Sequence, residues 1–380
     1  METKGGGEME QTVGLYIHIP FCRSKCDYCD FYSLAGAEDR MDAYGRALLR
    51  QMDAMPADLP ADTVYVGGGT PSWYGPDRLC ALLEGVFRRY RVTAEAEITV
   101  EANPDSVTAA GLRQLRRAGF NRLSLGMQSA RDDELRSVGR PHDAAAVARA
   151  VEAAREAGFD NLSLDLIYGL PGQDLTRWRE SVEAAAALAP EHLSCYGLQA
   201  EPGTPLYARR ASLPDDDVQA DLYLWAVRRL EQTGYRQYEI SNFARPGRES
   251  RHNLRYWRGQ PYLGVGPGAH SDFGGRRFSL PRDLEGYLRD AETGRFTRDE
   301  DRAVEAPERR EEYLMLRLRL REGVERSEYE TAWGVFFAPL EAHFAAWRRQ
   351  GLAAEENGRW RLTPEGFLLS NRLIGEILEE

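Results

Sequence analysis

Several features that would place this 380-residue chain in common functional classes are absent from its sequence. No run approaches the roughly 20 consecutive apolar residues that span a bilayer, and the first residues, METKGGGEMEQ, lack the basic start and apolar core of a targeting segment. We therefore expect a cytoplasmic protein without a transmembrane segment. The net charge is -11, so no excess of positive charge attracts a phosphate backbone. The sequence gives no support for a nucleic-acid partner.

Cysteine is scarce, and its five copies are an odd and modest number for a disulfide framework. Three of them, Cys22, Cys26 and Cys29, fall in one segment, VGLYIHIPFCRSKCDYCDFYS, with the spacing CxxxCxxC. Thiolates bind iron–sulfur clusters, usually four per cubane, so a loop offering three leaves one iron free for a small-molecule ligand. The spacing predicts a reactive cluster. A zinc site with His18 as fourth ligand is the alternative.

Short strand-like runs alternate with helical patterns over the first part of the chain. The strand candidates are VGLYIHI (13–19), TVYVGG near 63, AEITVEAN near 96, RLSLGMQ near 122, NLSLDLIYGLP near 161 and HLSCYGLQ near 192. The segments between them space apolar residues by three and four and end in glycine, as amphipathic helices do. Repeated βα units form a parallel sheet, so we predict an α/β fold, a partial (β/α)6 barrel whose strand ends gather one site.

The pattern changes twice along the rest of the chain. After about residue 235 it becomes irregular and glycine-rich, as in GVGPGAHSDFGG, which predicts a cover over the barrel mouth. From residue 306, helical patterns precede GRWRLTPEGF, which predicts a small winged-helix-like α+β module. Residues 306–380 carry 11 Arg and 14 Glu with no Lys or Asp, a balance that favours packing or a protein partner over DNA. We therefore predict three parts, 1–234, 235–305 and 306–380.

The segment HIPFCRSKCDYC resembles the cluster loop of the radical S-adenosylmethionine (SAM) superfamily, specifically the branch related to oxygen-independent coproporphyrinogen III oxidase. The resemblance implies a radical-SAM partial barrel and a [4Fe-4S] cluster on Cys22, Cys26 and Cys29. It also implies SAM, whose amino and carboxylate groups chelate the free iron, and an electron donor for the cluster.

The same resemblance marks further residues as SAM contacts. In VYVGGGTPS, glycines let the backbone approach a ligand closely, and polar side chains stand at later strand ends where apolar ones are expected. The implied set is Tyr16, Tyr28, Gly68, Gly69, Thr70, Glu101, Gln128, Arg140, Asp165, Gln199 and Ala269. The alternative interpretation is an internal polar network of the barrel, with the tyrosines as core packing.

Two features separate this chain from the oxidases of that branch. The oxidases carry another cysteine two residues after the third, where this sequence has Phe31, and a longer N-terminal extension. Residues 252–257 instead read HNLRYW, an HNxxYW motif typical of the heme chaperones of the branch. The implied heme contacts are His252, Asn253, Tyr256 and Trp257, since imidazole ligates heme iron and aromatic rings cover a tetrapyrrole. His270 is a second candidate ligand, and a capped turn with aromatic packing is the alternative.

The sequence thus predicts a heme chaperone that binds heme, one [4Fe-4S] cluster and SAM, and that transfers heme to acceptor hemoproteins, respiratory ones by resemblance. We expect no coproporphyrinogen oxidase activity from its radical SAM architecture. Two alternatives stay open. One is oxidative decarboxylation of coproporphyrinogen III to protoporphyrinogen IX, and the other is a non-catalytic metal-binding scaffold.

Overall fold

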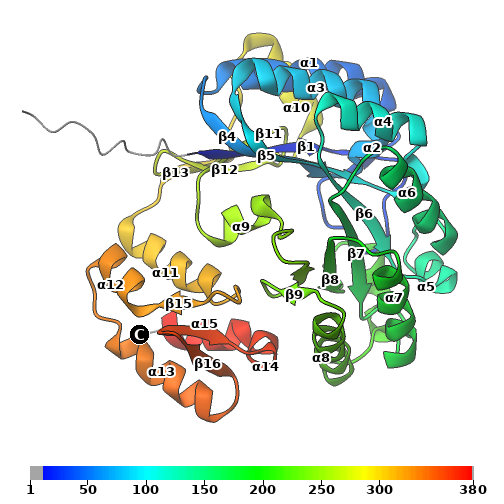
Figure 1. The fold of residues 1–380 in the computed structure, drawn as a ribbon. Helices are drawn as coiled ribbons and strands as arrows, with labels where there is room; N and C mark the ends of the chain where they lie inside the picture. Colours follow the sequence, from blue (N-terminus) through cyan, green and yellow to red (C-terminus); the bar gives the residue numbers. More distant parts are fainter. Residues whose placement is uncertain (1–11, 379–380) are drawn as a thin grey trace, which may run out of the picture.

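The computed structural model describes residues 12–378, most of which surround one curved sheet of twelve strands (Figure 1). The strands are β1 (Val13–Ile19), β4 (Pro60–Gly68), β5 (Arg91–Ala102), β6 (Arg122–Gln128), β7 (Leu162–Tyr168), β8 (His192–Gly197), β9 (Arg236–Gln237), β10 (Asn242–Ala244), β11 (Tyr262–Val265), β12 (His270–Phe273), β13 (Arg276–Ser279) and β14 (Glu300–Ala303). They pair in the order β14-β13-β12-β11-β1-β4-β5-β6-β7-β8-β10-β9.

Strands β1 and β4 to β8 are parallel neighbours, and helices cover their convex face (Figure 1). The helices of this part are α1 (Met41–Ala54), α2 (Pro71–Tyr74), α3 (Pro76–Arg89), α4 (Ala109–Ala118), α5 (Asp132–Ser137), α6 (Ala144–Glu156), α7 (Leu175–Ala187) and α8 (Asp216–Gln232). Asp143, Asp174 and Asp215 cap α6, α7 and α8 by accepting from backbone N–H groups of the first turn. The predicted α/β partial barrel is confirmed.

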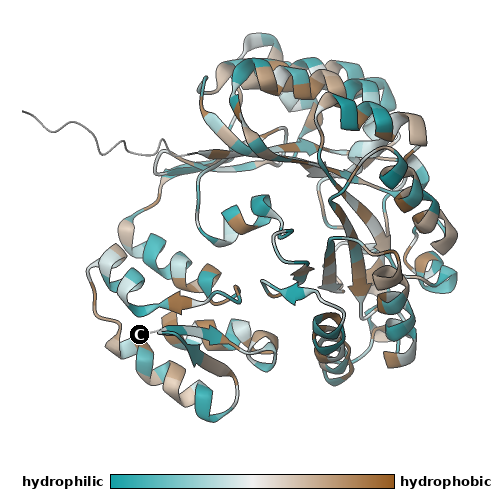
Figure 2. Ribbon diagram, in the orientation of Figure 1, coloured by the Kyte–Doolittle hydropathy of each residue, from teal (hydrophilic) through white to brown (hydrophobic). Residues whose placement is uncertain are grey.

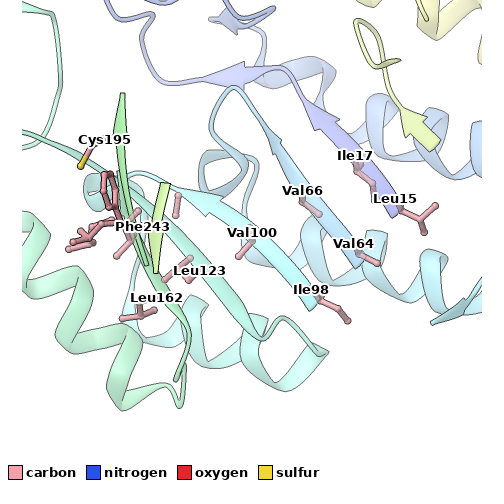
Figure 3. Close-up of a cluster of buried hydrophobic side chains, with 14 of the residues drawn as sticks. Leu15, Ile17, Val64, Val66, Ile98, Val100, Leu123, Leu162, Cys195 and Phe243 are labelled. Carbon is pink, nitrogen blue, oxygen red and sulfur yellow. The ribbon is translucent and has the colours of Figure 1, made fainter. Parts of the chain in front are cut away.

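Side chains alternate along the parallel strands between two environments. Those facing the helices are apolar and buried, as Figure 3 shows for Leu15, Val64, Val100, Leu123 and Leu162, and the central strands are largely hydrophobic in Figure 2. The intervening positions carry many polar side chains. Because neighbouring residues of a strand point to opposite faces, these polar side chains share the concave face. The apolar layer therefore holds the sheet together while the concave face is left for a site.

Residues 235–305 are more regular than their sequence pattern indicates. They add β10 and β9 to one edge of the sheet and β11 to β14 to the other, with β11 parallel to β1. The glycines read as irregular are turn residues: Gly266, Gly268, Gly274 and Gly275 have φ between +61° and +102°, a region that favours glycine. Helix α10 (Leu284–Thr293) lies between β13 and β14, the last strand of this segment.

Helix α9 (Arg251–Trp257) lies inside the curve of the sheet (Figure 1). Ser250 caps it by accepting from Asn253 N, and the Glu97 carboxylate accepts from Arg251 N and His252 N, both at 3.1 Å. A carboxylate at a helix N-terminus satisfies free N–H groups and opposes the helix dipole. Glu97 thus fixes this helix within the barrel.

Residues 306–378 form a small α+β module beside the open side of the sheet (Figure 1). It comprises α11 (Ala306–Arg317), α12 (Arg326–Trp333), α13 (Ala338–Arg349), α14 (Pro364–Leu368) and α15 (Ser370–Leu378), with the strands β15 (Val324–Glu325), β16 (Ala353–Glu356) and β17 (Arg359–Leu362) paired in the order β15-β17-β16. The segment GRWRLTPEGF supplies β17 and the start of α14, and β17 forms a hairpin with β16, which precedes that segment. Among residues 12–378, no helix combines the length and apolar character needed to cross a bilayer.

The module contacts both edges of the curved sheet. Beyond β9, Ile240 N donates to Arg319 O at 3.0 Å and Arg321 N donates to Tyr238 O at 2.9 Å. Near the opposite edge, Arg309 of α11 forms an ion pair with Asp272 of β12, the third strand from that edge. These contacts hold the module across the open side of the sheet.

Candidate functional site

The three clustered cysteines lie in the loop after β1. Cys22 ends the short strand β2 (Phe21–Cys22), and Cys26 and Cys29 follow before β3 (Leu34–Ala35). All three are free thiols. Burial raises the pKa of Cys22, and the Thr70 hydroxyl, which donates to Cys22 Sγ at 3.3 Å, opposes that rise. The loop therefore offers three free thiols, on one side of the sheet, that can ligate a metal.

The glycine-rich end of β4 packs directly on this loop. Gly69 N donates to Ile19 O and Thr70 N donates to Phe21 O, both at 2.8 Å. A Cβ added to Gly69 would lie 2.9 Å from both Ile19 O and Phe21 O and 3.0 Å from Cys22 Sγ. This approach is open only to glycine, so the GGGT segment sets the position of the first thiol.

A cavity of about 430 Å³ opens between the cysteine loop and the concave face of the sheet. All three cysteines line it. So do most of the predicted SAM residues, which come from separate strands and loops: Tyr28, Gly68, Gly69, Thr70, Glu101, Gln128, Arg140, Asp165 and Gln199. Tyr16 and Ala269 lie outside this lining. The cavity thus joins residues that are up to 231 positions apart, from Cys22 to Asn253.

Two partly buried carboxyl groups face the cavity. Glu101 accepts from the Tyr65 hydroxyl at 2.7 Å and from Gly68 N at 3.0 Å, and burial raises its pKa to about 7. Asp165 accepts from three serine hydroxyls, the nearest being Ser194 at 2.7 Å, and burial raises its pKa as well. Both groups can accept from ammonium or hydroxyl groups of a ligand.

Arg140 links the cysteine loop to the strand ends. Its guanidinium donates to Asn103 Oδ1 at 2.8 Å and Gly126 O at 3.0 Å, and it approaches Cys26 Sγ at 3.6 Å. Next to it, Gln128 has a φ of 63°, beside a register irregularity between β6 and β7. A non-glycine residue in the left-handed region is strained, and such strain gathers at functional sites.

Further cavity residues are not among the predicted ones. Arg122, 2% exposed, lines the cavity together with Ser124, Ser194 and Tyr196. Within residues 12–378 no carboxylate lies within ion-pair distance of the Arg122 guanidinium, and its buried Nε has no hydrogen-bond partner. In strands such as RLSLGMQ, polar or small residues alternate with apolar ones. Because alternate residues share one face of the sheet, this alternation indicates which residues face the cavity.

A second, shallower hollow of about 240 Å³ lies beside the first. Phe31 lines both. Tyr16 lines the hollow, with its hydroxyl donating to His18 Nδ1 at 2.9 Å, and Ala269 lies in the buried turn just before His270. The remaining lining includes Tyr32, Tyr256, Tyr262, His270 and Arg282.

The HNxxYW segment is helix α9, and its side chains point to different places. His252 is buried, with Nδ1 bonded to Thr63 Oγ1 at 2.9 Å and Nε2 to the Tyr256 hydroxyl at 2.8 Å, and burial lowers its pKa to about 3. Asn253 lines the large cavity and Tyr256 the hollow. Trp257 is half-buried at the helix end.

The donor set fits a polynuclear cluster better than a zinc ion. Within residues 12–378, no three His, Cys, Asp or Glu side chains lie close enough together to ligate one metal ion. His18, the fourth ligand of the zinc alternative, has Nδ1 bonded to Tyr16 and Nε2 donating to Tyr32 O at 2.8 Å. Three thiols around a cavity match a cluster whose irons each take one thiolate.

Comparison with known proteins agrees with this geometry. Residues 16–185 match the family model of the radical SAM superfamily, and residues 304–369 match that of the HemN C-terminal domain. Heme chaperone HemW of Bacillus subtilis is 37% identical over 377 residues, covering 96% of this chain and 99% of that protein. HemW of Escherichia coli is 37% identical, with coverage of 97% and 98%. The solved structure of coproporphyrinogen III oxidase (HemN) from Escherichia coli, a radical SAM enzyme, matches with a TM-score of 0.83 at 26% identity, covering 96% of this chain and 90% of that chain.

Proposed function

The chain belongs to the HemW family of the radical SAM superfamily, and from this premise we propose that it is a heme chaperone. It binds heme, one [4Fe-4S] cluster and SAM, and it passes heme to acceptor hemoproteins. The observation that carries the proposal is one cavity lined by three free cysteines of one loop and by polar side chains from four strand ends.

In this proposal Cys22, Cys26 and Cys29 hold three irons of the cluster, and the cavity seats SAM against the fourth. The bound cluster supplies an electron-transfer centre with one open coordination position, and an external donor reduces it. The Glu101 and Asp165 carboxylates accept from SAM donor groups. The proposed SAM contacts are Tyr16, Tyr28, Gly68, Gly69, Thr70, Glu101, Gln128, Arg140, Asp165, Gln199 and Ala269.

Heme contacts come from α9 in this proposal. The α9 helix carries His252, Asn253, Tyr256 and Trp257 along one short segment between the cavity and the hollow. Both ring nitrogens of His252 are hydrogen-bonded, one to Thr63 and the other to Tyr256. Ligation of iron through His252 therefore requires that one of these hydrogen bonds break. Tyr256 and Trp257 supply flat aromatic area for a tetrapyrrole.

Coproporphyrinogen oxidation is the second candidate function, favoured by the likeness of this fold to HemN. Phe31 is an argument against oxidase activity, because this position carries a phenyl ring that is 67% exposed instead of a fourth thiol beside the cluster loop.

We also propose that the three parts of the chain have different roles. Residues 1–234 form the barrel that holds the cluster, residues 235–305 carry the heme segment, and residues 306–380 form a packing or partner module.

Titration of the purified full-length protein with hemin, followed at the Soret band with and without cluster and SAM, tests the chaperone proposal. We expect saturable binding by the wild type. Binding should be weaker after His252→Ala, because the Tyr256 hydroxyl loses its hydrogen bond to His252 Nε2. An unchanged hemin spectrum on titration of the wild type overturns the proposal. Iron and sulfide analysis after anaerobic reconstitution should find about four irons per chain, and zinc alone would contradict the cluster assignment.

The oxidase candidate has its own test. Reconstituted protein is incubated anaerobically with coproporphyrinogen III, SAM and a reductant. We expect no protoporphyrinogen IX. Its formation, at a rate that disappears in a Cys22→Ser variant, would replace the chaperone proposal by the enzyme.

A further inference from the structure

We propose that the shallow hollow beside the SAM cavity is the heme seat and that His270, at the start of β12, ligates the heme iron. This inference rests on the proposed heme-binding function and names the ligand that function needs. The hollow is lined by aromatic rings, by His270 and by Arg282, and it shares Phe31 with the cavity of the cysteine loop.

The first support is the state of the six histidines in the chain. An axial ligand needs an imidazole nitrogen free to bind iron and open to the ligand. His18, His192 and His252 each have both ring nitrogens within 2.9 Å of a neighbouring hydroxyl or carbonyl. His142 is buried with Nε2 on Met127 O at 3.1 Å, and His343 belongs to the C-terminal module, where its ring packs against Trp347.

His270 differs from these. It is exposed, it lines the hollow, and neither of its ring nitrogens has a hydrogen-bond partner within residues 12–378. Its backbone is fixed, because β12 pairs with β13 through His270 and Ser279, and the preceding turn uses Gly266 and Gly268 at positive φ. A rigid backbone with an unengaged imidazole is a ready ligand that breaks no existing contact.

The walls of the hollow suit a tetrapyrrole. Tyr256 and Tyr262 meet edge to face with centroids 4.6 Å apart, and Tyr16 and Tyr32 complete the aromatic lining with Phe31. Aromatic rings contribute large apolar area and pack on a conjugated ring. A hollow of about 240 Å³ holds only part of a porphyrin, so the other part stays open to solvent and to an acceptor.

The hollow is also lined by a positively charged side chain, that of Arg282. Arg282 is exposed, and within residues 12–378 its guanidinium forms no ion pair or hydrogen bond. Gly268 leaves it room, since a Cβ there would lie 3.3 Å from Arg282 Cγ. The arginines nearest to the HNxxYW motif are already engaged: Arg255 with Asp62 and Arg258 with Glu322. Arg282 is therefore the guanidinium available to a heme propionate.

His252 then acts as a positioning residue. Its Nε2 bond to the Tyr256 hydroxyl and the edge-to-face contact of the two rings, 4.9 Å between centroids, orient the Tyr256 wall of the hollow. Loss of His252 should weaken heme binding through Tyr256 but leave the iron on imidazole.

The test compares His270→Ala, His252→Ala and the control His343→Ala in anaerobically reconstituted full-length protein, using hemin as the probe. Optical and electron paramagnetic resonance spectra report the axial ligand. We expect His270→Ala to lose the imidazole-ligated spectrum and to bind hemin about tenfold or more weakly. Mutation of even a residue that is hydrogen-bonded to a metal ligand lowers metal affinity by about that factor. Added imidazole should restore the wild-type spectrum to this variant. His252→Ala and His343→Ala should keep it.

His270→Met separates ligation from folding, because it offers iron a thioether and should shift the Soret band while the iron content of the cluster stays unchanged. A wild-type ligand spectrum in His270→Ala or His270→Met overturns this proposal and leaves the chaperone function standing. Failure of the wild type to bind hemin overturns both. Loss of the imidazole-ligated spectrum in His252→Ala but not in His270→Ala transfers the ligand role to His252 and also overturns it.

Discussion

At the scale of single residues, the glutamates Glu101 and Glu239 share a raised pKa but differ in what surrounds them. Glu101 faces the cavity and keeps two donors, whereas Glu239 lies in the loop after β9 at the contact with the C-terminal module. Burial raises the pKa of each to about 7. Both groups therefore link pH to folding, and Glu101 alone of the two also faces the cavity, where it can link pH to ligand binding.

The affinity for SAM should increase as the pH rises through about 7. Glu101 ionises across this range, and its carboxylate attracts the positive charge of SAM. Calorimetric titration of the reconstituted protein at pH 6 and pH 8 measures the difference. Glu101→Gln should bind SAM weakly at both values, and a variant with the full wild-type pH dependence would contradict this role for Glu101.

Stability should respond to Glu239 in the opposite sense to an ordinary surface carboxylate. Between its usual pKa of 4.5 and its folded pKa of about 7, the folded state holds more protons than the unfolded state, so the free energy of unfolding falls as pH rises. Urea unfolding of Glu239→Gln at several pH values should show a flatter dependence than the wild type. Glu355→Gln, an exposed glutamate of the C-terminal module, is the control.

At the scale of elements, the sequence predicts the six parallel strands well because each has local periodicity, and it predicts the cysteine loop because the spacing is local too. It does not reveal that the glycine-rich segment around Gly266 and Gly274 forms the turns of edge strands. It also does not show that His252 faces inward to Thr63, since that orientation depends on Glu97, which is 155 residues away in sequence. Such orientations depend on contacts between residues far apart in the sequence, which local periodicity does not reveal.

The close contact between the GGGT segment and the cysteine loop predicts a strong effect of one methyl group. Gly69→Ala should displace Cys22 and lower the iron content after reconstitution, because the added Cβ would crowd Ile19 O and Phe21 O. Gly375→Ala is the matched control, since nothing lies within 4 Å of its Cβ in α15, and it should stabilise the protein by up to about 1 kcal/mol. Full iron content in Gly69→Ala would refute this prediction.

The Glu97 cap predicts local mobility of α9. Glu97→Ala removes the acceptor of Arg251 N and His252 N, and loss of such a cap costs about 0.5 to 2 kcal/mol. Hydrogen exchange measured by mass spectrometry should speed up in residues 251–257. Glu95→Ala, two residues earlier and exposed, should leave that exchange unchanged.

At the scale of the whole molecule, the C-terminal module depends on charged contacts with the edge of the sheet. Asp272 pairs with both Arg277 and Arg309, and all three side chains are at most 24% exposed. Asp272→Asn should weaken the docking of α11 by about 1.5 to 3 kcal/mol, the range for hydrogen bonds to charged groups. Limited proteolysis near residue 305 should then be faster. Asp299→Asn provides a control, and equal cleavage rates would show that the pair does not hold the module.

The contacts of that module with both edges make a closed ring from a sheet that is open by itself. Among the described residues, none of the module lines the cavity or the hollow, so the module can affect both through its contacts with the sheet at Tyr238 and at Asp272. If a partner of the module binds better when the two edges move apart, and the ligand of the cavity binds better to the closed ring, each must weaken the binding of the other by the same factor. A partner that docks on the module can then lower the affinity of a site that it does not touch.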